Sequence, residues 1–519
     1  MSLIAQHLAM LPILVPLLAG ALLIVVDEPR HKLKASISVT AMLLLLLAAA
    51  ALAARAGAPV THVYSLGAWA APMGIVLVAD RLAALMVLLT AILALAALLF
   101  ALARWHRAGP QFHSLLQFLL AGLNGAFLTG DLFNLFVFFE LLLAASYGLA
   151  LYGGGTPRVR ASLHYIVINL AASLLFLVGV SLLYGMAGTL NMADLAVRLP
   201  KLPAEDRALL EIGAATLAVA FVVKAGMWPL GFWLPGTYTA SSAPAAALFC
   251  ILSKVGIYAL VRVWFVVFSE GPGAELIAYG GMATLVFGIV GMLGSQDLRR
   301  IASFSLVVSS GTLLATIGVG GSNVLAPALL YLVTSTLGTA ALFLLVELIE
   351  RSRAPGANLL AMTAEAFRVD EDDGAQPEEL VGVLIPATMA VLGLAFAFAT
   401  LLIAGLPPLP GFLAKFTMLA ALLDTPRITA GAWLLFGLVV LSGLAAMIAL
   451  VRAGVRIFWA DAGRIAPRVR LIEIVPVAGL IGACLGLTVF AGPALKYLHE
   501  AGNALNPADA YIREVLRSP

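Results

Sequence analysis

The chain has 519 residues, of which 62% are hydrophobic and only 11% are charged. A soluble protein would carry about 25% charged residues, so this composition excludes a globule that is covered by water. Apolar runs long enough to cross a bilayer recur along the whole sequence. They predict an all-α polytopic membrane protein rather than a transmembrane barrel, whose strands are short and alternate in polarity.

Charge and cysteine content exclude further classes. The net charge of +3 is small and scattered, which argues against nucleic-acid binding. The two cysteines, Cys250 and Cys484, lie in apolar runs, and neither a CxxC pair nor a His/Cys cluster accompanies them. We therefore expect no iron–sulfur centre, haem or other cofactor, and no metal site.

Fourteen membrane spans are expected in chain order. The first 26 residues lack a basic start and are too long for a cleaved signal, so they count as the first span. The spans lie near residues 3–26, 35–54, 74–103, 111–129, 131–152, 161–185, 207–227, 242–268, 274–294, 300–320, 324–349, 381–405 continuing through 411–424, 428–452 and 471–492.

Lysine and arginine gather in alternate loops, which sets the expected orientation. With the N-terminus outside, the inner loops contain most of these residues, including the groups at 30–34, 104–107, 299–300 and 452–470. Both termini are therefore predicted to face the periplasm or the exterior of a bacterial inner membrane.

The seventh and twelfth spans are interrupted. Pro229 and Gly231 break the first of them, and Pro408 and Gly411 break the second. Non-helical backbone at membrane depth survives only beside protein or a water-filled cavity. A Gly-Phe pair at each break, and an Ala-Leu-Val-Arg sequence in the span after each, indicate two inverted five-helix repeats around an ion path. The alternative is chance recurrence in a chain rich in alanine, leucine and glycine.

This pattern divides the chain into four parts. Residues 1–110 hold helices 1–3, residues 111–268 form the first repeat (helices 4–8), and residues 269–452 form the second (helices 9–13). Residues 453–519 hold helix 14 and a C-terminal tail. The second repeat includes an acidic loop at 351–379, which is either solvated or rests against a partner subunit.

Four ionisable residues lie well inside spans: Glu140, Lys224, Lys254 and Lys415. Each would cost about 2.5–3.5 kcal/mol at mid-bilayer, so each must face a hydrated interior or another charge. Burial favours a neutral lysine and a nearby carboxylate favours a charged one, so such a set can relay protons. For Glu140 and Lys224 alone, a static ion pair between helices is the alternative; Lys254 and Lys415 have no carboxylate in their own spans.

Weaker candidates surround this set. His164 is either a proton feeder or an interfacial histidine, and Glu347 is either a proton entrance or a solvated helix end. Thr334 and Ser335 belong to a group of hydroxyl residues in spans 10 and 11 that serve either close packing or a water wire. Asp80, with Arg81 beside it, is expected to be an interfacial anchor or half of a local pair.

Four motifs match a known family. The sequences at 134–140, 224–229, 253–256 and 408–412 resemble those of proton-translocating antiporter-like subunits, namely the L, M and N chains of complex I and the subunits of Mrp cation/proton antiporters. The motif that ends in Glu140 looks most like that of the D-type subunit of the Mrp complex.

The resemblance implies fourteen helices around a polar axis at mid-membrane. It assigns Glu140 and Lys224 to the first-half pair, Lys254 to the centre and Lys415 to the end of the second half. Relatives often carry histidines in helix 10 or 11, where this chain has Thr334 and serines, so a relay there would need water held by hydroxyls.

The function implied is that of a proton-translocating subunit in a multisubunit antiporter that exchanges a monovalent cation, expected to be sodium, for protons. The expected partners are other subunits of that complex, the lipid bilayer, monovalent cations and protons. This is secondary transport and not enzyme catalysis. The alternative is a proton-pumping subunit of a redox-driven complex, such as NADH-quinone oxidoreductase or a membrane-bound hydrogenase.

Overall fold

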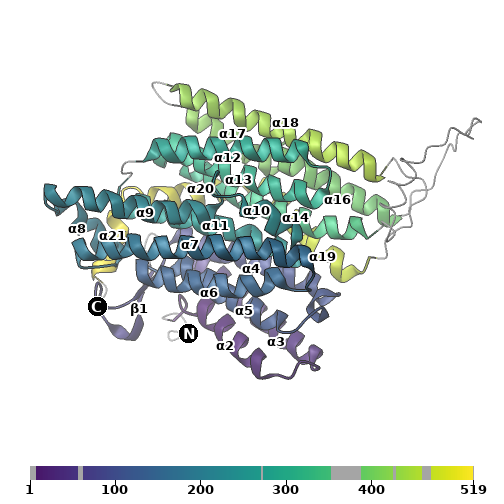
Figure 1. Ribbon diagram of the computed structural model, residues 1–519, viewed down its shortest axis with the longest axis horizontal. Helices are drawn as coiled ribbons and strands as arrows, with labels where there is room; N and C mark the ends of the chain where they lie inside the picture. Colours follow the sequence, from purple (N-terminus) through teal and green to yellow (C-terminus); the bar gives the residue numbers. More distant parts are fainter. Residues whose placement is uncertain are drawn as a thin grey trace, which may run out of the picture.

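A computed structural model describes residues 7–56, 62–269, 273–351, 387–424, 428–458 and 469–517. Most of these residues form helices that lie side by side, with α2 and α3 at one edge of the bundle and α18 at the other (Figure 1). The predicted acidic loop at 351–379 lies outside the described residues except for Arg351. The helices span Leu11–Val25 (α2), His31–Ala56 (α3), Arg81–Leu102 (α4), Phe112–Leu128 (α5), Leu132–Leu151 (α6), Thr156–Ala187 (α7), Met192–Arg198 (α8), Arg207–Ala225 (α9), Trp233–Ala240 (α10), Ala243–Val267 (α11), Ala274–Gly294 (α12), Leu298–Gly320 (α13), Leu325–Glu350 (α14), Ala387–Ala404 (α16), Pro410–Leu423 (α17), Ala430–Phe458 (α18), Leu471–Val489 (α19), Ala491–Asn503 (α20) and Asp509–Arg517 (α21).

The helices have the lengths that a membrane requires. Within the described part, 11 segments are long and apolar enough to cross a bilayer, and three shorter apolar helices (α2, α5 and α17) accompany them. One of the 11 segments, Leu298–Glu350, contains both α13 and α14. The predicted class, an all-α polytopic membrane protein, is confirmed, whereas the count of fourteen spans and the inverted repeats stay predictions.

The predicted start of the third span is wrong. The third span was expected to begin near residue 74, but residues Val76–Ala79 form strand β2, which pairs antiparallel with β1 (His62–Ser65). The run Val76-Leu77-Val78 is apolar enough for either a membrane span or a buried strand, and its β-branched valines favour the strand. Asp80 then accepts a hydrogen bond from the backbone N–H of Ala83 and starts α4 as its N-cap.

The hairpin marks one end of the bundle, which we call the hairpin end. Helices α8 and α21 lie at this end with β1, at the left of Figure 1. Helix α4 runs away from it to the short 3-10 turn η2 (Trp105–Arg107), which lies at the opposite end with the start of α13, the end of α14 and the start of α19.

Helix α11 forms the centre of the bundle. All of its residues are buried, and it packs against α4, α9, α13 and α14. An apolar helix that is buried all round fits the interior of a helical membrane protein. Any charged side chain on α11 must therefore be accommodated by its neighbouring helices.

Both predicted helix breaks are present. Gly226 directly follows the end of α9 and Gly405 directly follows the end of α16, and each glycine has a φ of 77°, in the left-handed region that favours glycine. A short helix restarts after each break, α10 at Trp233 and α17 at Pro410. The second break leaves the carbonyl oxygens of Ile403 and Ala404 next to the ammonium of Lys415.

Candidate functional site

Lys224 lies in the last turn of α9 with an apolar and hydroxyl environment. Its ammonium donates to Ser173 Oγ at 3.3 Å and lies 5.1 Å from the centre of the Phe139 ring. Lys224 also lines a cavity that reaches Asn169 on α7 and Gly256 on α11. The cavity leads from the end of α9 towards the central helix.

Glu140 lies next to Phe139 on α6 and is not bonded to Lys224. No ion pair within 4 Å joins the two side chains in the described part of the chain. The Oε1 atom of Glu140 is buried without a hydrogen-bond partner, although the residue as a whole is partly exposed. The expected first-half pair is therefore open in this structure, and Glu140 has an unused acceptor.

Lys254 occupies the middle of α11 and is fully buried. Its ammonium donates to Ser309 Oγ on α13 at 2.8 Å, and Ser309 Oγ donates to Ser335 Oγ on α14, also at 2.8 Å. Tyr331 lines the same cavity as Ser309 and Ser335. A chain of hydroxyls thus leads from the central lysine to the interface between α13 and α14.

This chain ends in a cavity, which we call the hydroxyl cavity. Its volume of about 20 Å³ is room for roughly one water-sized sphere. Its polar lining consists of Ser305 and Ser309 from α13, Tyr331, Thr334, Ser335 and Thr339 from α14, and Ser442 from α18. The predicted accessory residues Thr334 and Ser335 therefore do lie together, on the side of Lys254 that faces α13 and α14.

Lys415 lies on the far side of the hydroxyl cavity. Its ammonium contacts the carbonyl oxygens of Ala404, at 3.0 Å, and Ile403, at 3.5 Å, which end helix α16. Ile403 and Gly411 also line the cavity. Because a helix C-terminus carries partial negative charge, these carbonyls suit a cation.

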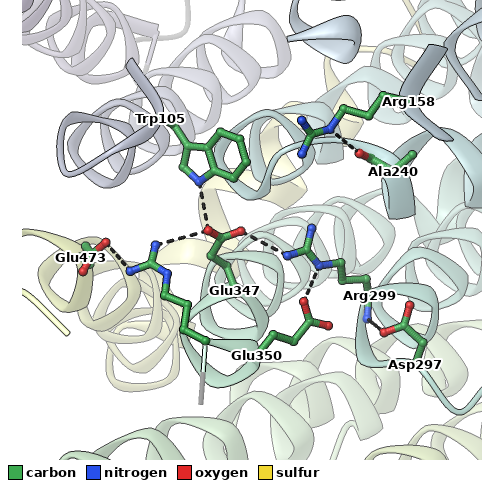
Figure 2. A network of polar contacts seen from close by, with 9 residues as sticks. Trp105, Arg158, Ala240, Asp297, Arg299, Glu347, Glu350 and Glu473 are labelled. Atoms are coloured by element: carbon green, nitrogen blue, oxygen red, sulfur yellow. Dashed lines mark hydrogen bonds and ion pairs between the residues drawn. The ribbon is translucent and has the colours of Figure 1, made fainter. Parts of the chain in front are cut away.

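Glu347, the candidate proton entrance, lies at the end of the bundle opposite the hairpin end, beside η2. Its side chain is the centre of a cluster of charges (Figure 2). Its carboxylate accepts from the Trp105 indole at 3.1 Å, from Arg299 at 3.2 Å and from Arg351 at 3.3 Å. Arg351 also bonds the buried Glu473 on α19 at 2.6 Å. Figure 2 shows that the cluster joins η2, α13, α14 and α19. Glu347 is thus paired and not a solvated helix end.

His164, the other accessory candidate, is not part of the site. Its side chain is exposed on α7 beside the exposed Leu163 and Val167, and its Nδ1 lies 2.9 Å from the carbonyl oxygen of Arg160. The structure brings the three lysines, Thr334 and Ser335 around one buried axis and leaves His164 on the outer face.

Sequence reasoning missed the links between these groups. Ser309 was only one of many hydroxyl residues in its span, and nothing local distinguishes it from Ser310. The carbonyls of Ile403 and Ala404 could have been anticipated, because the helix break after them is visible in the sequence.

Comparison with known proteins identifies the family. The family described as "NADH:quinone oxidoreductase/Mrp antiporter, TM" matches residues 129–444, which include Glu140 and all three buried lysines. The chain belongs to this family. The resemblance seen in the sequence motifs is therefore confirmed, and the match covers both helix breaks.

Similar members of the family align along their whole length. The chain is 53% identical to the D subunit of a "Probable K(+)/H(+) antiporter" from Rhizobium meliloti, over 99% of this chain and 98% of that protein. It is 35% identical to the D subunit of a "Na(+)/H(+) antiporter" from Alkalihalophilus pseudofirmus, over 99% and 100%. A chain in the structure of the Mrp complex from Dietzia sp. has a TM-score of 0.83 at 27% identity, over 98% of this chain and 99% of that one.

Proposed function

We propose that this chain is a proton-translocating, D-type subunit of a multisubunit antiporter that exchanges a monovalent cation for protons across a bacterial inner membrane. End-to-end similarity to the D-type subunits of two antiporters is the observation that carries this proposal. The chain is then a transporter subunit, and not an enzyme, that works with the other subunits of its complex.

The buried charges supply a mechanism. Within the described residues, Lys224, Lys254 and Lys415 are bonded to hydroxyls or carbonyls and not to carboxylates. An ammonium that lacks a counter-ion in the membrane interior is costly, so a change in a neighbouring charge can drive its proton on or off. Closing Glu140 onto Lys224 would hold a proton in the first half, and opening the pair would push protonic charge towards Lys254 and Lys415.

The transported cation is proposed only as monovalent. The sequence alone led us to expect sodium, whereas the two relatives carry potassium and sodium in their names. Transport measured with each ion separately, in the complex that contains this chain, decides between them.

A redox-driven complex is the second candidate, because the family description also includes NADH:quinone oxidoreductase. A chain in such a complex would move protons only when quinone or another acceptor is reduced. Purifying the complex separates the two functions: antiport predicts proton movement on cation addition alone, and redox coupling predicts iron–sulfur subunits in the preparation.

The orientation and repeats complete the proposal. The basic residues favour placing the hairpin end and both termini outside, and the Glu347 cluster inside. The parts 111–268 and 269–452 would be the inverted repeats, each with one broken helix. A reporter fused after Pro519 should read as external, and an internal reading would reverse the orientation.

Vesicle transport tests the function directly. We expect Lys254→Met to lower cation-dependent proton exchange in everted vesicles at least about tenfold, because it removes the central proton carrier without adding volume to the core. Lys201→Met, at an exposed position, is the matched control. Normal exchange by an assembled Lys254→Met complex would mean that the buried charge is silent and would refute the relay.

A further inference from the structure

The hydroxyl cavity presents acceptor oxygens. The hydroxyl groups of Ser305, Thr334 and Ser442 each donate back to a carbonyl of their own helix, at 2.7, 3.0 and 2.7 Å. A hydroxyl whose proton is used in this way turns its lone pairs outward. Three helices therefore direct hydroxyl lone pairs at one enclosed space.

Backbone carbonyls lie at the edge of the same space. Helix α16 ends at Ala404, where its last carbonyls have no partner within the helix, and Ile403 lines the cavity. Unwound carbonyls and half-helix C-termini are recurrent ligands of alkali cations in transporters. Neutral oxygens are also the ligands that hard, monovalent ions prefer.

The ammonium of Lys415 already acts as a cation at this place. It contacts the carbonyl oxygens of Ala404 and Ile403. Gly443 lies close by, since a Cβ added there would be 3.5 Å from the Lys415 Nζ atom. An ammonium group and an alkali ion compete for the same oxygens because both carry one positive charge.

We propose that the hydroxyl cavity is a binding site for a partly dehydrated monovalent cation, and that protonated Lys415 competes with this cation for the carbonyls that end α16. The inference rests on the proposed function and gives the cation its place in this chain. Met292, Leu402 and Ala446 form an apolar part of the lining, which leaves little room for a hydration shell.

Charge explains why binding would be coupled to a proton. No carboxylate lines the cavity among the described residues, so a divalent ion would lack compensation there. The ammonium groups of Lys254 and Lys415 flank the site, and a third positive charge would be repelled by both. Entry of the cation therefore requires Lys415 to release its proton to water, which leaves a neutral amine: one cation binds for each proton that leaves.

Equilibrium binding to the purified complex tests the site. The probes are radioactive sodium and rubidium ions, rubidium standing in for potassium. Thr334→Val and Ser442→Ala should each weaken binding at least about tenfold while the complex still assembles. Thr400→Val is the control, because its hydroxyl donates to Phe396 within α16 and does not line the cavity. Unchanged binding in both cavity variants would overturn the proposal.

The lysine variants test the competition. Binding to the wild type should weaken about tenfold per pH unit in the acid range, where one proton displaces one cation. Lys415→Gln should bind at every pH without this dependence, and Lys415→Arg, which stays charged, should not bind at any pH. Equal pH dependence in the wild type and Lys415→Gln would refute the competition.

The outcomes for the site and for the proposed function can be told apart. If the wild-type complex exchanges cations for protons but all the cavity variants bind the cation as the wild type does, only the proposed cation site is refuted. If the wild-type complex shows no exchange on cation addition, the antiport function is wrong.

Discussion

The carboxylate of Asp80 forms a buried ion pair with the guanidinium of Arg262, two turns beyond Lys254 on α11. Arg262 Nη2 donates to Asp80 Oδ1 at 2.8 Å, and its other terminal nitrogen bonds Oδ2. The hydroxyl of Tyr258 accepts from the same guanidinium, and the ring of Tyr511 on α21 lies 5.5 Å from it. The pair thus joins α4, α11 and the C-terminal helix at the hairpin end.

Removing one charge of this pair should destabilise the protein. Asp80→Asn leaves the buried Arg262 charge without its partner, a change that costs about 3–5 kcal/mol. We expect a lower thermal unfolding midpoint of the detergent-solubilised complex. Asp27→Asn is the control, because the Asp27–Arg30 pair is exposed and such pairs contribute about 0–1 kcal/mol. Equal midpoints for Asp80→Asn and the wild type would contradict a stabilising role.

Ser309 should control transfer between Lys254 and the second half. Ser309→Ala removes the hydroxyl that accepts from Lys254 and donates to Ser335, so we expect at least about a tenfold loss of proton exchange in an assembled complex. Ser309→Thr keeps a hydroxyl and should retain part of the rate. Ser181→Ala, at an exposed position on α7, is the control and should exchange protons at the wild-type rate. A wild-type rate in the Ser309→Ala complex would show that Ser309 is not part of the proton path.

The sequence predicts the helices well because the bilayer imposes their length and polarity. Both ends of α12 agree with the expected span, and both helix breaks follow from proline and glycine. The error at 74–80 has a physical cause: Val76, Leu77 and Val78 satisfy the hydropathy of a span, and only their pairing with β1 makes them a strand.

The sequence also predicts which charges are buried, but not what they contact. Lys254 stands out because a charged side chain in an apolar span is costly and needs a polar partner or water. Its partner Ser309 lies on another helix. In the same way, Arg262 on α11 bonds Asp80 at the start of α4. Asp80 was expected to be an interfacial anchor or half of a local pair, but it pairs with Arg262, while Arg81 bonds Glu500 on α20 at 2.7 Å. Such contacts depend on how helices pack, and a single sequence carries no record of that.

Glu347 is either a structural counter-charge or a proton entrance, and one variant separates the two roles. As the centre of the cluster in Figure 2, it compensates Arg299 and Arg351, so Glu347→Gln should cost about 2–4 kcal/mol of stability. If its role is structural, proton exchange per assembled complex should stay within about twofold of the wild type. Exchange lost from a fully assembled complex would instead identify Glu347 as a proton entrance.

A pair of histidines next to this cluster should respond to pH. His106 Nδ1 and His113 Nε2 lie 3.4 Å apart, and Trp105, which bonds Glu347, precedes His106 in η2. Burial lowers the pKa of His106 below its usual 6.5, and the charges of Arg107 and His31 lower it further. The folded state thus favours neutral His106. Stability from this contact is present above about pH 6.5 and is lost as the pH falls towards the lowered pKa.

Hydrogen exchange at residues 103–111 measures this response. Protection factors, which correct for the intrinsic effect of pH, should fall between about pH 7.5 and pH 5.5 in the wild type, because protonating His106 opposes its burial beside other positive charges. His106→Gln cannot take up the proton, so its protection should stay level over the same range. The exposed His499→Gln, on α20, should behave as the wild type does. A parallel fall in His106→Gln would assign the response to a different group.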